Sequence, residues 1–354
     1  MYGISVFLGE EITNQTRNYI QKMQQIGFEG IFTSLHIPED DASLYAERLK
    51  ELGRIAKVNQ MKLMVDISGE ALMRAGFSFE DLDEIIAIGV TGLRMDYAIS
   101  NQKIAEASRI IEIGLNASTI TEKDVAELNY YKADFTNFQA WHNYYPRPET
   151  GLSSQFFNSK NSWLKEVGFQ VFAFIPGNGE LRGPLGEGLP TLEKHRYTNP
   201  LAAAIELKED FDIDGIYIGD PRISERTRLQ FEEYNHKKLI LMEVADVGSD
   251  YYELILGDHT NRQDEARDVL RSADARFRDR VTIIPERAQS RNLGSVTVDN
   301  ELYGRYMGEI QVALKELPAD KKVNVAAKIV KDDRSLLNVI KAGSAFKLIE
   351  KGNL

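Results

Sequence analysis

Two aspartates stand at the same point of neighbouring hydrophobic segments, and their spacing suits acid–base chemistry. The segments "KLMVDIS" (62–68) and "GLRMDYA" (92–98) read as buried strands that carry Asp66 and Asp96 at their ends. Neighbouring strands lie about 4.8 Å apart, so both carboxylates can face one substrate bond. In glycoside hydrolysis one carboxyl group protonates the leaving oxygen, while the other attacks the sugar or activates water. The alternative is structural: one aspartate caps the next helix or pairs with Arg94.

The elements that must hold these aspartates repeat along the first two-thirds of the chain. Eight short hydrophobic runs alternate with amphipathic segments or long loops. The runs are 2–8, 30–35, 62–68, 92–97, 111–118, 134–141, 169–176 and 215–220. They are apolar throughout rather than alternating, which is typical of parallel strands buried on both faces. This rhythm predicts an α/β fold, a (β/α)8 TIM barrel over residues 1–237. An open doubly wound sheet is the alternative, but the Gly-rich phosphate loop typical of that fold is missing.

In such a barrel the active site lies at the carboxyl ends of the strands, so the polar residue at each strand end is a candidate for substrate binding. Besides Asp66 and Asp96, these residues are Glu10, His36, Asn116, Gln139, His142, Asn143, Asp220 and Arg222. A metal ion is a competing use of His36, His142 and the two aspartates. The five histidines are scattered and no H-x-H or HExxH spacing occurs, so we expect neither a metal site nor a cofactor.

The segment 137–153, "NFQAWHNYYPRPETGLS", gathers aromatic rings beside amide, imidazole and guanidinium groups. A sugar presents apolar C–H faces ringed by hydroxyls, so flat aromatic rings beside polar partners make a sugar site. Tyr144 and Tyr145 fit this platform, and we place Tyr145 in the site with Arg147 as an anion clamp. Trp141 is expected to lie in the core. The alternative is an aromatic wedge packed at a domain boundary.

A long loop follows the seventh predicted strand, "PGNGELRGPLGEGLPTLEKHRYTNP" (176–200). Long irregular loops inside compact domains are commonly lids or binding loops. This one carries Arg182 and Arg196, and Arg222 follows the eighth strand. Because barrel enzymes often bind phosphate at the loops after their last two strands, we expect these arginines to hold a phosphate. Each of them can equally be an ordinary surface charge.

The pattern changes after residue 237. Short runs with alternation and turn residues between them predict a second domain over residues 238–354, rich in β-strands and built as a small barrel or sandwich. The runs are 239–247, 251–257, 280–286, 294–299, 308–317 and 323–331. One segment, "RQDEARDVLRSADARF" (262–277), predicts a helix between them.

Composition narrows the class of protein. The 354 residues carry a net charge of −11, which disfavours nucleic acid as a partner because phosphate-backbone binding needs a basic surface. The chain has no cysteine, so disulfides and thiolate chemistry are excluded. Neither a signal peptide nor a membrane-spanning run is recognisable, so we expect a cytoplasmic protein without membrane contact.

Four motifs carry a resemblance to a known family: "WHNYYPRPETGLS", "GPLGEGLPTLEKHR", "GDPRIS" and "GSVTVDNELYGRYMGEIQ". Together they resemble the bacterial 6-phospho-N-acetylmuramidases. The resemblance implies a (β/α)8 barrel followed by a small cyclophilin-like β-barrel domain. It also implies hydrolysis of the β-1,4 bond between N-acetylmuramic acid 6-phosphate and N-acetylglucosamine in cell-wall recycling. The partner would then be a small phosphorylated disaccharide; the sequence makes no prediction of oligomeric state.

Two other functions fit the same residues. The first is a metal-dependent sugar-phosphate isomerase or aldolase on the same barrel, which a chelator would inactivate. The second is a non-enzymatic carbohydrate-binding protein that uses the aromatic segment as an adhesive patch. A ring of buried strand-end carboxylates disfavours the second, because such groups are costly to bury.

Overall fold

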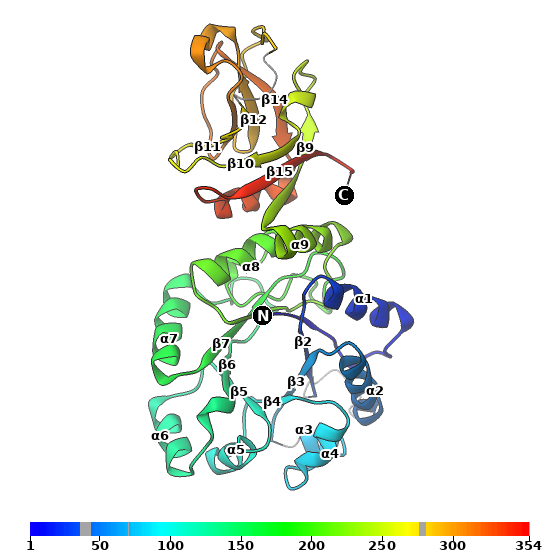
Figure 1. Ribbon diagram of the computed structural model, residues 1–354. Coiled ribbons are helices and arrows are strands. Elements are labelled where there is room, and N and C mark those ends of the chain that lie inside the picture. The colour runs from blue at the N-terminus through cyan, green and yellow to red at the C-terminus, as the bar shows by residue number, and fades with distance from the viewer. Residues whose placement is uncertain (36–43, 70, 276–280, 354) are drawn as a thin grey trace. The chain divides into compact units, whose positions relative to one another are not determined.

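A computed structural model describes residues 1–35, 44–69, 71–275 and 281–353. They form two compact units, Met1–Ser224 and Glu225–Leu354, each of which is described by itself (Figure 1). The candidate site residue His36 lies outside the described residues.

The first unit is a closed barrel of eight parallel strands that follow one another in chain order. The strands are β1 Tyr2–Ser5, β2 Gly30–Ser34, β3 Lys62–Ile67, β4 Gly92–Met95, β5 Glu112–Asn116, β6 Phe138–Trp141, β7 Gln170–Ile175 and β8 Gly215–Ile218. Strand β1 closes the barrel by pairing with β8, where Tyr2 lies beside Ile216. The predicted (β/α)8 barrel is therefore confirmed.

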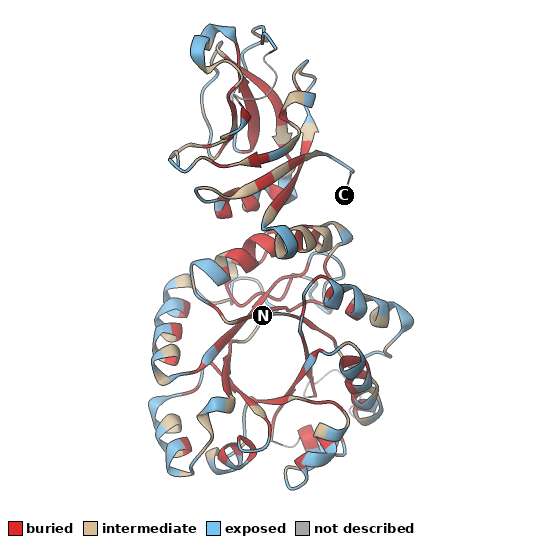
Figure 2. Cartoon of the chain, viewed as in Figure 1, coloured by how far each residue is buried: buried red, intermediate tan, exposed pale blue. Residues whose placement is uncertain are grey.

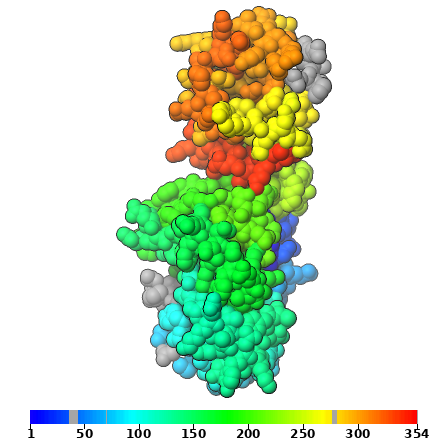
Figure 3. Space-filling view, turned by 90° about the vertical axis from the view of Figure 1, so that its left-hand side faces the viewer, coloured from blue at the N-terminus to red at the C-terminus, as the bar shows by residue number. Residues whose placement is uncertain are grey.

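Helices cover the outside of this barrel. They are α1 Asn14–Gln25, α2 Tyr45–Val58, α3 Ala71–Arg74, α4 Leu82–Ala87, α5 Asn101–Ala107, α6 Glu122–Tyr130, α7 Ser154–Val167 and α8 Pro200–Glu209. The strands are buried almost throughout, whereas the helices bury one face and expose the other (Figure 2). In the space-filling view, the cyan-to-green middle of the chain forms the surface of this unit on the side that carries α6 and α7 (Figure 3).

Aromatic side chains fill the interior of the barrel. Trp141 is 1% exposed and stacks on Phe172 with their ring centroids 4.4 Å apart, which confirms the prediction that it belongs to the core. Tyr217 packs against Trp141 and occupies the space beside Gly3, where a Cβ atom would come within 2.1 Å of its ring. The barrel is therefore a packed core, and any site must lie above this layer.

The second unit is built on a seven-stranded sheet in the order β10-β15-β9-β14-β12-β13-β11. Its strands are β9 Leu239–Asp246, β10 Gly257–Thr260, β11 Val269–Arg271, β12 Ser295–Asp299, β13 Ile310–Ala313, β14 Val323–Ile329 and β15 Ala345–Glu350. Neighbouring strands are antiparallel except for β9 and β15. Helix α9, Glu225–Lys237, precedes the sheet, and its Gln230 side chain donates to the Leu241 carbonyl and to Asp333. The predicted β-rich C-terminal fold is confirmed.

The helix predicted over residues 262–277 is wrong. Strand β11 lies inside this segment instead, and Leu270 pairs with Val312 of β13. Arg271 pairs with Glu309 of a neighbouring segment at 2.8 Å, and Arg262 pairs with Asp264 inside this segment. Tertiary pairing therefore overrides the local helical preference.

Among the described residues, no helix has both the length and the hydrophobicity needed to cross a membrane.

Candidate active site

Arg94 is the centre of a charged cluster at the carboxyl ends of β3 and β4. It is 3% exposed, and its Nη1 atom lies 2.5 Å from Asp66 Oδ1 and 3.6 Å from Asp96 Oδ1. Because both oxygens approach one nitrogen atom, they lie no more than about 6 Å apart. The two aspartates picked out by their spacing are thus neighbours, and the salt bridge weighed as an alternative for one of them also forms.

The two aspartates have different surroundings. Asp66 is 5% exposed and accepts a hydrogen bond of 3.1 Å from the Ser34 hydroxyl. The side chain of Asp96 is 20% exposed and accepts a hydrogen bond of 2.8 Å from Asn116 Nδ2. A ligand can therefore approach Asp96 more easily than Asp66.

Asn143, which follows β6, completes this cluster. Its Oδ1 atom accepts a hydrogen bond from Arg94 Nη2 and lies 3.5 Å from Asn116 Nδ2. We call the group the carboxylate cluster; its members are Asp66, Arg94, Asp96, Asn116 and Asn143. Burial alone would lower the pKa of Arg94, but Asp66 and Asp96 raise it overall, so the guanidinium stays charged. One positive charge faces two carboxyl groups.

Tyr144, the next residue along the chain, points to a second arginine. Its hydroxyl accepts a hydrogen bond of 3.0 Å from Arg182 Nη1, and its ring packs edge-on against Phe32 and Phe174. The pKa of Tyr144 is raised, mainly by burial and further by Asp66. The positive charges of Arg182 and Arg94 oppose this shift, so the Tyr144 hydroxyl interacts electrostatically with both arginines. The sequence predicted a binding site in this aromatic segment, but it assigned Tyr145 to the site and not Tyr144.

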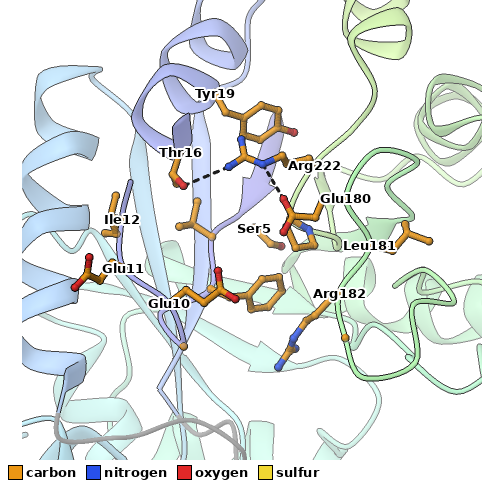
Figure 4. A pocket seen from close by; sticks show the side chains of 15 residues that line it. Ser5, Glu10, Glu11, Ile12, Thr16, Tyr19, Glu180, Leu181, Arg182 and Arg222 are labelled. Carbon is orange, nitrogen blue, oxygen red and sulfur yellow. Dashed lines mark hydrogen bonds and ion pairs between the residues drawn. The ribbon is translucent and has the colours of Figure 1, made fainter. Parts of the chain in front are cut away.

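A cavity of about 300 Å³ lies among the segments that follow β1, β7 and β8 (Figure 4). Three of the predicted binding residues line it: Glu10, Arg182 and Arg222. Phe7, Tyr19 and Glu180 lie beside them. This is the part of the barrel mouth where the sequence predicted a phosphate site.

The two arginines of the cavity differ in their partners. Arg222 donates to Glu180 at 2.9 Å and to the Thr16 hydroxyl at 3.3 Å. Arg182 has no carboxylate partner within the described part of the chain, and its guanidinium carbon lies 4.2 Å from the centre of the Phe7 ring. The charge of Arg222 is balanced locally, whereas that of Arg182 is not.

Two strand-end residues lie away from this site. His142 is fully buried, its Nε2 atom lies 2.7 Å from Asn161 of α7, and burial lowers its pKa to about 4. Gln139 accepts from the Trp141 indole at 2.9 Å and donates to Glu112 at the amino end of β5. The structure therefore places both in the packing of β6 and not with the carboxylate cluster or the cavity.

Two further candidates hold loops in place. Asp220 is fully buried and accepts hydrogen bonds from the backbone N–H groups of Gly177, Leu189 and Arg182. Arg196 is 4% exposed and pairs with Glu193 through Nε and Nη2.

Arg196 also donates to four backbone carbonyls, those of Tyr145, Arg147, Glu187 and Gly188. These contacts occupy its guanidinium, which leaves little of it for a phosphate. Tyr145 lies half-buried on the loop after β6, and its backbone N–H donates to the carbonyl of Pro190. The side chain of Arg147 is exposed and has no partner among the described residues.

The described residues contain no group of three or more histidine and carboxylate side chains arranged to hold a metal ion. His36, one of the four candidate ligands, lies outside this part of the chain.

Two solved structures resemble the whole chain. A crystal structure of a conserved protein of unknown function from Enterococcus faecalis is 59% identical, with a TM-score of 0.93 over 99% of this chain and 97% of that one. An uncharacterized B. cereus protein is 25% identical, with a TM-score of 0.73 over 99% of both chains. A comparison with curated proteins found no significant match.

Both parts of the chain match one protein family. Residues 2–233 match its N-terminal region and residues 239–349 its C-terminal region. The name of the family describes a glycosidase that acts on a 6-phosphorylated amino sugar. Since the two matches cover nearly the whole sequence, the chain belongs to the 6-phospho-N-acetylmuramidase family.

Proposed function

We propose that this protein is a cytoplasmic glycoside hydrolase of cell-wall recycling. Its substrate is N-acetylmuramic acid 6-phosphate joined by a β-1,4 bond to N-acetylglucosamine, and its products are the two free sugars. The observation that carries this proposal is the carboxylate cluster: two aspartates within about 6 Å at the carboxyl ends of barrel strands, in a chain that belongs to this family.

The chemistry assigned to the cluster needs one acid and one nucleophile or base. Asp96, the more exposed aspartate, protonates the glycosidic oxygen as the bond to N-acetylglucosamine breaks. Asp66 attacks the anomeric carbon, and the ester it forms is then hydrolysed by water that Asp96 activates. Carboxyl groups about 5–5.5 Å apart act with retention, whereas inversion requires a wider gap for water. The limit of about 6 Å on their nearest oxygens favours retention.

A second route uses the same residues. The acetamido group of the substrate can act as the nucleophile, in which case one aspartate orients it and no ester to the protein forms. Asp66, buried and paired with Arg94, suits that orienting role. Both routes retain the anomeric configuration, and trapping of a covalent ester to Asp66 distinguishes them.

The substrate must extend from the carboxylate cluster to the cavity. The cavity supplies an aromatic surface in Phe7 and Tyr19, and carboxylate acceptors for sugar hydroxyls in Glu10 and Glu180. Its arginines supply positive charge for the phosphate.

A product assay tests the proposal. The purified protein is incubated, with and without chelator, with the disaccharide in its 6-phosphorylated and unphosphorylated forms, and products are identified by mass spectrometry. We expect cleavage of the phosphorylated form only, unaffected by the chelator. Cleavage of neither form would reject the glycosidase assignment, and loss of activity with chelator would favour the metal-dependent alternative.

A further inference from the structure

The loop that follows β6 connects the carboxylate cluster with the cavity. Asn143 accepts a hydrogen bond from Arg94 of the cluster, and its neighbour Tyr144 accepts one from Arg182 of the cavity. Two consecutive side chains thus hold one arginine from each place. The two arginines are thus linked through one peptide unit and the side chains of Asn143 and Tyr144.

This loop is fixed along its backbone. The His142 N–H donates to Phe172 at 2.9 Å, the Thr191 hydroxyl donates to the Asn143 carbonyl at 2.9 Å, and the Tyr145 N–H donates to Pro190 at 3.0 Å. Backbone hydrogen bonds at His142, Asn143 and Tyr145 thus fix the chain on both sides of Tyr144. Tyr144 and Asn143 therefore present a rigid pair of acceptors.

Arg182 has the properties of an anion-binding side chain. Its charge is not balanced by a carboxylate of the described residues, and one face of its guanidinium rests near Phe7. Among the described residues, the Arg182 side chain makes one hydrogen bond, to Tyr144, so its other N–H groups can bind a ligand. Glu10 and Glu11 also line the cavity and would repel an anion, which places the anion on the Arg182 side.

We propose that Arg182 binds the phosphate of the substrate and that Tyr144 is a positioning residue, which holds Arg182 in register with Asp66 and Asp96. A phosphorylated sugar bound at Arg182 then places its glycosidic bond at the carboxylates. The identity of the ligand rests on the proposed function. The guanidinium fork suits a phosphate monoester because it can donate two parallel hydrogen bonds.

Binding measurements test the role of Arg182 without any turnover. Titration calorimetry compares N-acetylmuramic acid 6-phosphate with N-acetylmuramic acid on the full-length protein, on Arg182→Gln and on the control Arg109→Gln. Arg109 is an exposed arginine whose hydrogen bonds in the described part of the chain go to the backbone carbonyls of Tyr131 and Lys132. We expect Arg182→Gln to weaken the binding of the phosphorylated sugar about 10- to 100-fold and to leave the affinity for the unphosphorylated sugar unchanged.

Each outcome of this titration decides the assignment. Unchanged affinity of Arg182→Gln for the phosphorylated sugar would reject Arg182 as the phosphate ligand, as would a native protein that binds both sugars equally. If the native protein binds the phosphorylated sugar through Arg182 but cleaves no disaccharide, the binding site stands and the hydrolase assignment fails.

Tyr144→Phe tests the positioning role, since it removes the hydroxyl and keeps the ring. We expect KM for the phosphorylated disaccharide to rise about tenfold with a smaller change in kcat. Tyr130→Phe, at a tyrosine that is 79% exposed on α6, is the matched control and should behave as the native protein. If Tyr144 acts through Arg182, the double variant Tyr144→Phe/Arg182→Gln is no worse than Arg182→Gln alone.

A merely structural role for Tyr144 predicts a different result. The two substitutions would then multiply in the double variant, or Tyr144→Phe would lower kcat equally for phosphorylated and unphosphorylated substrates. Either result would overturn the proposal for Tyr144.

Discussion

At the scale of single residues, the charge balance around Arg94 controls the proposed chemistry. Asp66 and Asp96 share one guanidinium, so the group as a whole carries an excess negative charge. In the proposed roles, Asp96 delivers the proton to the leaving group, while Asp66 keeps its contact with Arg94.

Neutralising either aspartate should slow turnover strongly. We expect Asp66→Asn and Asp96→Asn each to lower kcat by about 10²- to 10⁴-fold. Asp66→Asn should also lower the melting temperature, because Arg94 loses its closest buried partner. The control is Asp83→Asn, an exposed residue of α4. Near-normal kcat in both site variants would remove the pair from the mechanism.

Asp299, which belongs to the last of the four family motifs, should make the stability of the second unit depend on pH. It is 4% exposed, and its carboxyl group has no hydrogen bond within the described residues. Burial raises its pKa to about 7, with Glu309 adding to the effect. The folded state therefore holds a proton between about pH 4 and 7 that the unfolded chain has already lost, so stability falls as the pH rises through this range.

Asp299→Asn should remove this dependence. From pH 5 to pH 8 we expect the native protein to lose on the order of 2 kcal/mol of unfolding free energy relative to the variant. Urea unfolding of both proteins at the two pH values measures the difference. Parallel stability profiles would show that the carboxyl group is ionised in the folded state at both pH values.

At the scale of elements, the parity of strand residues explains which predicted site residues lie together with the carboxylate cluster and which do not. Successive side chains of a strand point to opposite faces. Trp141 points into the barrel, so His142 turns outward to α7, while Asn143 points inward again. The sequence analysis took every polar residue at a strand end as a site candidate and did not consider parity. It therefore selected Gln139, His142 and Asn143 alike. Gln139 has the right parity but lies below the aromatic layer.

Long-range partners explain what the sequence could not predict. The barrel followed from the rhythm of its strands, and Asp66 and Asp96 followed from their equal places in two of them. Arg196 and Arg182 occupy the same loop and look alike in sequence. Only the fold shows that Glu193 and four carbonyls occupy Arg196, while Tyr144 and Phe7 leave Arg182 available.

Arg196 should therefore matter for the loop and not for the phosphate. We expect Arg196→Ala to lower the free energy of unfolding by about 2–3 kcal/mol, because it leaves Glu193 and several buried carbonyls unpaired. The ratio of activities on phosphorylated and unphosphorylated disaccharide should stay as in the native protein. A selective loss of the phosphorylated substrate would instead return Arg196 to the phosphate site.

At the scale of the whole molecule, the net charge of −11 opposes an anionic substrate. Long-range repulsion is screened by salt, since the Debye length falls from about 30 Å at 0.01 M to about 10 Å at 0.1 M. We expect kcat/KM for the phosphorylated disaccharide to rise about twofold over this range. A neutral substrate analogue serves as the control. A marked fall would mean that the local arginines dominate the approach.

The aromatic interior of the barrel also makes the protein its own optical reporter. Both tryptophans, Trp141 and Trp163, belong to the first unit. Trp141 is buried among phenylalanine and tyrosine rings, so its emission should be blue-shifted and should move to the red only when the barrel opens. Far-ultraviolet circular dichroism reports on the strands of both units. Unfolding curves from the two signals, recorded on one sample, will therefore reveal whether the barrel and the β-domain melt together or in sequence.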